Sequence, residues 1–424
     1  MHMPRSKRSR FIRASCLALA LALTGAPALL RPAPARAADQ QPIKVGLIIP
    51  VTGAFAALGQ YMKEGLDLYL QEHDYTLGGR KIVIDEVDDR NIPSVALTQV
   101  RKLVEQDHVD LLFGVASASI GTALVPYVTQ HKIPTIYPIV SSDDLSQRTP
   151  VKYIVRTGWT SSLTTHVLGD YAYKTLKYRK VATIGYDFQF GWESIDGFVD
   201  TFQRDGGKVV KELWTPLSTT DFSPYLSEIP RDVDAVVCSF SGTLAVNFIQ
   251  QYRSFGLKMP LICQGNATDE STLAKTGPAA VGIIGALQYS AALDTPANKK
   301  FVAAYTKAFG HGPGYYGEGS YIGAQVLGDA LDAVHGDVSN TDAFLKALHD
   351  VKITDAARGP IHFDQYGGPV ENVYIRKIEM VNGQLENVVI KTYPNVSQFW
   401  TYDPSQYLKQ PSYGRDYPPC NACK

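Results

Sequence analysis

The sequence has no surplus of charge of either sign. Its 424 residues contain 41 Lys and Arg against 41 Asp and Glu, so the formal net charge is zero, and 45% of the residues are hydrophobic. A nucleic-acid-binding protein normally carries a basic surplus or a basic stripe, and a disordered chain is poor in hydrophobic residues. The composition therefore indicates a globular protein that does not bind nucleic acid.

The short motifs of the common enzyme classes are missing as well. The sequence has no Walker phosphate loop, no Gly-x-Ser-x-Gly elbow, no His-Glu-x-x-His pair and no Gly-x-Gly-x-x-Gly after its first predicted strand. The 9 histidines are scattered. His166 and His362 could lie in a cleft, although a structural role is the expected one. We expect no enzymatic activity, no bound cofactor and no metal site.

Cysteine is scarce, with only 5 residues, which is too few for a disulfide-based scaffold. Cys238 and Cys263 lie at the ends of apolar, strand-like runs, and the simplest interpretation is two small buried hydrophobic residues. Cys420 and Cys423 lie in a Pro-rich C-terminal tail. A local disulfide is expected there rather than a zinc site, because zinc normally takes four ligands and no second pair is spaced to complete the set.

The N-terminus carries the only dense basic run of the chain, between Arg5 and Arg13. An apolar stretch from Ala14 to Leu30 follows, and then the small-residue pattern Ala35-Arg36-Ala37. These features predict a secretory signal peptide, residues 1–37, cleaved before Ala38. A membrane anchor is the alternative, but the Gly and Pro residues in the stretch favour a cleavable signal. We therefore expect an exported, periplasmic protein.

The rest of the chain contains an internal duplication. Four landmarks recur in the same order at a spacing of roughly 130 residues. The paired segments are Lys44–Ile48 with Lys180–Ile184, Glu64–Lys81 with Glu193–Lys208, Val109–Leu112 with Val233–Val236, and Ile133–Ile136 with Met259–Ile262. Each copy alternates predicted strands and helices, and its apolar runs are typical of parallel strands covered on both faces. The sequence predicts an α/β fold of two similar doubly wound lobes with a ligand cleft.

The segment after Tyr289 cannot form a third repeat. It predicts helices at 297–309, 321–334 and 341–351, and then strands at 360–363 and 373–378. We expect these elements to pack first on one lobe and then on the other, so that several crossings form a hinge. The predicted parts are 38–158 with about 287–369 for lobe 1, 159–286 with about 370–393 for lobe 2, and 394–424 for a surface tail.

Ligands of doubly wound sheets bind beyond the carboxyl ends of the strands. The loop from Gly114 to Ser119 follows a predicted buried strand and precedes a helix. Its serines could act only as helix N-caps, or they could bind an anion together with free backbone N–H groups, and both interpretations stay open. Ser141 and Ser142, at a neighbouring strand end, favour the anion site. Aromatic residues also gather at the predicted strand ends, namely Phe55, Trp159, Tyr186, Phe188, Phe190, Trp192, Phe240 and Tyr289.

A series of short motifs between about residues 43 and 390 resembles the type I periplasmic binding proteins, and among them the branched-chain amino-acid receptors of ABC importers. The motifs are Thr52-Gly53 with Gly59, Gly78-Gly79-Arg80-Lys81, Asp88-Asp89, Gly114–Ser119, Ile133-Pro134, Arg156-Thr157, Gln189-Phe190-Gly191 and Gly256-Leu257. The resemblance implies a two-lobed, monomeric receptor that closes on a small solute and delivers it to a membrane permease.

The resemblance also implies which residues bind the solute's carboxylate. In this family a Ser in the loop matching Ala116–Ser119 does so, together with groups that match Ile139 and Ser141. A gap-free match places Ala118 on the usual Ser, so either Ser117 or Ser119 is expected to replace it. The family's loop aromatic matches Phe190, and its first-loop Tyr matches Leu58.

The acid that holds an amino acid's ammonium in this family matches Gly265, which has no side chain. Enclosing an ammonium without a partner costs ~3–5 kcal/mol, so an α-amino acid is disfavoured. The expected ligand is a small carboxylate with an apolar or aromatic body, enclosed by Phe190, Trp192, Phe240 and Leu58. Branched-chain amino-acid binding, or a ligand-sensing receptor of the same fold, is the alternative.

Overall fold

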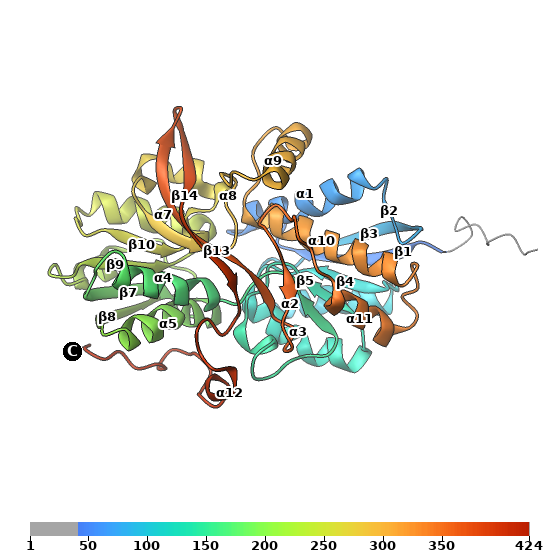
Figure 1. The fold of residues 1–424 in the computed structure, drawn as a ribbon, viewed down its shortest axis with the longest axis horizontal. Helices are drawn as coiled ribbons and strands as arrows, with labels where there is room; N and C mark the ends of the chain where they lie inside the picture. The colour runs from blue at the N-terminus through green and yellow to red at the C-terminus, as the bar shows by residue number, and fades with distance from the viewer. Residues whose placement is uncertain (1–40, 424) are drawn as a thin grey trace, which may run out of the picture. The chain divides into compact units, whose positions relative to one another are not determined.

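The computed structural model describes residues 41–423, and the predicted signal peptide at 1–37 lies outside them. Two β-sheets with helices on their faces make up the described chain (Figure 1). The predicted α/β class with two doubly wound lobes is confirmed. Among the described residues, no helix combines the length and the apolar character needed to cross a bilayer.

The first sheet has six strands in the order β2-β3-β1-β4-β5-β6. Its strands are β1 (Ile43–Ile49), β2 (Thr76–Leu77), β3 (Arg80–Asp88), β4 (Leu111–Gly114), β5 (Thr135–Tyr137) and β6 (Ile154–Arg156). The connecting helices are α1 (Ala56–Glu72), α2 (Pro93–Glu105) and α3 (Ala118–His131). All pairs except β2 with β3 are parallel. The loops after β1, β3, β4 and β5 therefore leave the same edge of the sheet.

The second sheet has eight strands in the order β12-β13-β11-β10-β9-β7-β8, with β14 paired to β13. Its strands are β7 (Lys180–Tyr186), β8 (Lys208–Thr215), β9 (Ala235–Ser239), β10 (Leu261–Gln264), β11 (Ile284–Leu287), β12 (His362–Phe363), β13 (Pro369–Val381) and β14 (Gln384–Val396). Its helices are α4 (Leu163–Lys174), α5 (Gln189–Arg204), α6 (Ser223–Glu228), α7 (Gly242–Ser254) and α8 (Glu270–Thr276). The turn Asn382-Gly383, with φ of 50° and 81°, closes the β13–β14 hairpin.

Three helices follow β11, as the sequence predicts: α9 (Pro296–Phe309), α10 (Tyr315–Ala333) and α11 (Thr341–Asp350). In Figure 1, α10 lies beside α1, and the two helices approach closely because both have glycine at the contact. A Cβ atom added at Gly65 would lie 1.9 Å from the carbonyl oxygen of Gly317. The helix α10 begins earlier than predicted, since the Asp269 carboxylate accepts the Tyr315 N–H at 2.8 Å.

Cys238 and Cys263 are not separate buried residues, so that interpretation is wrong. They face each other on the adjacent parallel strands β9 and β10 and form a disulfide, with their Cα atoms 4.5 Å apart and both side chains fully buried. In the sequence, the similar position of the two cysteines at the ends of apolar runs was the available sign of a disulfide. The sequence did not show that these two strands pair in a register that brings the cysteines face to face.

Removing this disulfide is expected to destabilise the protein by about 2–4 kcal/mol, because the bond closes a loop in the unfolded chain. Urea unfolding of the Cys238→Ser/Cys263→Ser double variant measures the effect. The matched control is Cys420→Ser/Cys423→Ser, whose bond spans only 3 positions of sequence. Equal unfolding midpoints for the first double variant and the wild type would contradict the prediction.

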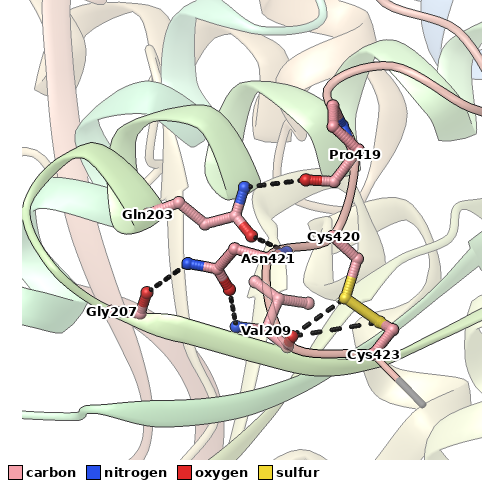
Figure 2. Close-up of a disulfide and its surroundings, with 7 residues drawn as sticks. All are labelled: Gln203, Gly207, Val209, Pro419, Cys420, Asn421 and Cys423. Atoms are coloured by element: carbon pink, nitrogen blue, oxygen red, sulfur yellow. Dashed lines mark hydrogen bonds between the residues drawn. A yellow bond between two sulfur atoms is a disulfide. The ribbon is translucent and has the colours of Figure 1, made fainter.

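The predicted local disulfide between Cys420 and Cys423 is confirmed. It lies at the end of the tail, which starts after Val396 and includes the short helix α12 (Pro404–Tyr407). Figure 2 shows how the tail is held against α5 and β8. Asn421 donates to the Gly207 carbonyl at 2.9 Å and accepts the Val209 N–H at 3.1 Å. The disulfide keeps this last turn in the shape that makes both contacts.

His166 has the structural role expected of it. It is fully buried on α4, Nδ1 lies 2.9 Å from the Thr201 hydroxyl, and the rings of Tyr402, Tyr407 and Tyr413 from the tail pack around it. Burial lowers the pKa of His166 to about 4. His362 is half-buried on β12 and does not line the cavity described below.

This buried histidine predicts a pH-dependent stability. At pH values above the unfolded pKa of about 6.5 the ring is neutral in both states, and as the pH falls towards 4 only the unfolded chain gains the proton. Acid should therefore remove on the order of 3 kcal/mol of stability between pH 6.5 and 4. Urea unfolding across this range, with His166→Gln as the comparison, measures it. If both proteins lose the same stability, His166 does not contribute.

Candidate ligand-binding site

A cavity lies where loops of both sheets meet. The space between its lining atoms amounts to about 430 Å³, part of it open to solvent. It is lined by Phe55, Leu58, Asn91, Ala116, Ser117, Ala118, Ile139, Ser141, Trp159, Phe188, Phe190, Ser241, Asn266 and Tyr316. No lining residue carries a charge, so hydroxyls, amides, aromatic rings and backbone groups determine what binds.

The loop after β4 directs the N-terminus of α3 at this cavity. Gly114 has φ of 116° and Val115 has φ of 63°, a left-handed conformation that a β-branched residue rarely adopts. The Val115 N–H donates to the Ile48 carbonyl at 2.6 Å, and the side chain is fully buried, which holds the backbone in place. Strained backbone of this kind is typical of binding sites.

Ser117 is the N-cap residue of α3, and its side chain makes no capping hydrogen bond. The first turn of α3 contains no acidic residue either. Its hydroxyl is therefore available to a ligand, and so are the first N–H groups of a 14-residue helix. A helix N-terminus with free N–H groups favours an anion without any Lys or Arg.

Ser141 contributes a second hydroxyl to the cavity. Its oxygen accepts a hydrogen bond from the Ser161 hydroxyl at 2.9 Å, and its carbonyl accepts the Ser161 N–H at 2.7 Å. These contacts fix Ser141 from behind, and its own hydroxyl proton is free to donate when the Ser161 proton points at the Ser141 hydroxyl rather than at the Ser141 carbonyl, 3.0 Å away. The sequence placed both Ser117 and Ser141 at neighbouring strand ends, and the structure brings them together in one cavity.

Aromatic rings form the apolar wall. Trp159 and Phe190 meet edge to face with centroids 6.3 Å apart, and Phe188 lies 6.2 Å from Phe190. Phe55 and Leu58, from the loop after β1 and the start of α1, add further apolar surface. Such a wall suits the flat apolar body of a small ligand.

Hydrogen bonds join the loops of the two sheets beside the cavity. Gln189 donates to the Ser142 hydroxyl at 2.5 Å and accepts from the Thr122 hydroxyl at 3.2 Å. On another side, the Thr243 hydroxyl donates to the Ala54 carbonyl at 3.3 Å. The loops and helix starts that follow one sheet thus contact those of the other at two places.

Several residues predicted for the site lie outside the cavity lining. Ser119 follows on α3 but does not reach the cavity, which leaves Ser117 as the serine of this loop that does. The Trp192 indole N–H donates to Asp187 at 3.1 Å instead. Phe240 and Tyr289 are fully buried in the core, where Phe240 packs on Phe248 and Tyr289 on Phe301. Both residues follow strands, but their side chains point into the hydrophobic core.

Gly265 also lies outside the lining, contrary to the prediction. A Cβ atom at this position would lie 2.6 Å from the Ala286 carbonyl oxygen and 2.9 Å from Arg376, so no side chain fits. The residue that lines the cavity is its neighbour Asn266. This part of the cavity therefore presents the Asn266 amide and no acid that could pair with an ammonium.

Five lining residues were not among the predicted site residues: Asn91, Phe188, Ser241, Asn266 and Tyr316. Asn91, Phe188, Ser241 and Asn266 follow β3, β7, β9 and β10, so the strand-end rule could have found them. Tyr316 comes from the first turn of α10, and no local signal marks it.

A family model described as periplasmic binding protein matches residues 42–384. The chain belongs to this family. Among curated relatives, Leu/Ile/Val-binding protein homolog 6 from Brucella melitensis is 30% identical over 375 residues, which cover 85% of this chain and 93% of the relative. The resemblance to branched-chain amino-acid receptors is thereby confirmed.

Two solved structures extend the comparison. A solute-binding protein of an ABC transporter from Rhodopseudomonas palustris BisB5, in complex with 3,4-dihydroxybenzoic acid, is 33% identical with a TM-score of 0.79, covering 86% of this chain and 99% of that one. Another from R. palustris, in complex with benzoate, is 29% identical with a TM-score of 0.79, covering 84% and 97%. This periplasmic binding protein is thus of the ABC-transporter substrate-binding type, a family of solute-binding proteins.

Proposed function

We propose that this periplasmic binding protein captures a small aromatic carboxylate and delivers it to the membrane permease of an ABC importer. The observation that carries the proposal is the cavity lining. It combines the free N-terminus of α3 and the Ser117 and Ser141 hydroxyls with rings such as Phe190, and it contains no charged side chain. The benzoate and dihydroxybenzoate complexes of the two R. palustris proteins support the same ligand class.

The polar groups suit a carboxylate in number and kind. Each hydrogen bond to a charged group contributes about 1.5–3 kcal/mol, so two hydroxyls and the helix N–H groups offset much of the cost of dehydrating the anion. The ring wall then removes apolar ligand surface from water, at about 25 cal/mol per Å².

An amino acid is the second candidate, because the Brucella relative is named for Leu, Ile and Val. Three acids that could approach a bound ammonium do not line the cavity, and each already accepts a hydrogen bond through one oxygen. Asp187 accepts from Trp192, Glu193 accepts from Gln189 at 3.0 Å, and Glu270 accepts from Asn387 at 2.9 Å. Burial raises the pKa of Glu193 well above its usual range, and the neighbouring Asp143 adds to this shift, so it is a poor partner for an ammonium.

Delivery requires that the two sheets, each with its helices, act as lobes that close on the solute. We propose that the chain crossings near Trp159, residues 286–289 and residues 368–371 form the hinge, and that the loop contacts of Gln189 and Thr243 are made on closure. Export to the periplasm and function as a monomer, as in the sequence prediction, belong to the same proposal.

Tryptophan fluorescence offers the test, because Trp159 lines the cavity. Protein freed of ligand by unfolding and refolding should show a saturable fluorescence change on addition of benzoate, and the change should shrink in the Trp159→Phe variant. Mass spectrometry of small molecules retained by the purified protein should identify an aromatic acid. No saturable change with any aromatic acid, together with a retained amino acid, would refute the proposal.

A further inference from the structure

The cavity receives a second helix N-terminus, from the other sheet. Ser241 is the N-cap residue of the 13-residue helix α7, and its side chain makes no capping hydrogen bond, as for Ser117 on α3. The two serines are equivalent in the internal duplication, since Ser241 stands as far beyond Val233 as Ser117 does beyond Val109. Both line the cavity.

A buried tyrosine beside Ser241 supplies an independent donor. Tyr316 is 3% exposed and lines the cavity. A chain of hydrogen bonds fixes it: the Gln264 amide donates to the Asn266 side-chain oxygen at 3.1 Å, and the Asn266 amide donates to the Tyr316 hydroxyl oxygen at 3.1 Å. Because that oxygen already accepts from Asn266, the proton of Tyr316 is left to donate, either to the neighbouring Ser241 hydroxyl or to a ligand. Burial raises the pKa of Tyr316, which keeps this proton in place.

The cavity therefore has more donors than a carboxylate at α3 can use. Besides Ser117 and Ser141, it offers the hydroxyls of Ser241 and Tyr316, and the buried Trp159 indole N–H has no hydrogen-bond partner. Buried donors left without an acceptor cost about 1–3 kcal/mol each. A ligand with a second acceptor group removes part of that cost.

The second acceptor should be neutral. Two carboxylates in a small cavity would repel each other, and no cation among the lining residues offsets the repulsion. A phenolic oxygen carries no charge at neutral pH and still accepts a hydrogen bond. We infer that the preferred ligand is an aromatic acid with a hydroxyl group on its ring, and that Tyr316 and Ser241 select it by donating to that oxygen.

This inference rests on the proposed function, and calorimetry can separate the two. The probes are benzoate, 3-hydroxybenzoate, 4-hydroxybenzoate and terephthalate, titrated into the ligand-free full-length protein. At least one hydroxybenzoate should bind roughly three- to tenfold more tightly than benzoate. Tyr316→Phe and Ser241→Ala should reduce that advantage while leaving benzoate affinity within about threefold. Tyr407→Phe, which removes a buried hydroxyl of the C-terminal tail outside the cavity, is the matched control and should change neither affinity.

Each outcome bears on a distinct claim. If benzoate binds but no hydroxybenzoate binds more tightly, the inference fails and the proposed function stands. Equal losses of benzoate and hydroxybenzoate affinity in Tyr316→Phe would assign Tyr316 a structural role and overturn the inference. If terephthalate binds more tightly than every hydroxybenzoate, the claim that the second acceptor group is neutral is wrong. If no aromatic acid binds at all, the proposed function fails with it.

Discussion

Replacing Ser117 with Ala is expected to weaken benzoate binding about 10- to 150-fold, the equivalent of one hydrogen bond to a charged group. The side chain of Ser117 makes no capping hydrogen bond in α3, and Ser117 lines the cavity. Removing its hydroxyl should therefore weaken ligand binding without destabilising the helix. The free energy of unfolding without ligand should therefore change by less than about 0.5 kcal/mol. Calorimetry and urea unfolding measure the two quantities.

The neighbouring serine provides the control for this experiment. Ser119 lies on the same turn of α3, and its side chain does not line the cavity. Ser119→Ala should leave benzoate affinity within about twofold of the wild type. If Ser119→Ala loses affinity and Ser117→Ala does not, then Ser119 and not Ser117 holds the carboxylate.

The substitution Asn266→Asp is expected to weaken the binding of aromatic acids strongly. It places a carboxylate of nearly the same shape in the cavity lining, where it can still accept from Gln264 and can accept from Tyr316. A second negative charge in the same enclosed cavity repels the carboxylate of the ligand by up to several kcal/mol, so benzoate should bind at least about 100-fold more weakly.

This experiment depends on the new carboxyl group being ionised. Burial raises the pKa of a carboxyl group, so the titrations belong at pH 8. Asn266→Ala separates the lost amide from the added charge, and it should weaken benzoate binding far less. If Asn266→Asp and Asn266→Ala weaken benzoate binding equally, then the absence of charge in the cavity lining does not determine the preference for an acid.

Much of the fold could be predicted because its signals are local and repeated. Apolar runs such as Val109–Val115 and Ala235–Phe240 become the parallel strands β4 and β9, and the duplication predicts that each is followed by a helix. The disulfide of Cys238 with Cys263 could not be predicted in the same way. It depends on the register between β9 and β10, which is set by packing across the sheet.

Some lining residues were predicted because they follow strand ends, while predictions that depended on side-chain direction failed. Ser117 and Ser141 are placed by the backbone, so the strand-end rule found them. Phe240 and Tyr289 stand at similar places, but their rings pack into the core, and only the direction of the side chain in the folded protein distinguishes them from Phe190. Tyr316 reaches the cavity only because α10 packs back across α1.

The central claim is that the cavity accepts a carboxylate and rejects the ammonium of an amino acid. Titration calorimetry of the ligand-free wild type with matched pairs tests it most directly: 3-phenylpropionate against phenylalanine and 4-methylpentanoate against leucine, with benzoate as the reference. Each pair differs only by the ammonium, whose unpartnered burial costs ~3–5 kcal/mol, so each acid should bind at least about 100-fold more tightly than its amino acid. Benzoate should bind at micromolar concentration or below. Micromolar binding of leucine or phenylalanine, with failure of the matched acids and of benzoate, would contradict the account.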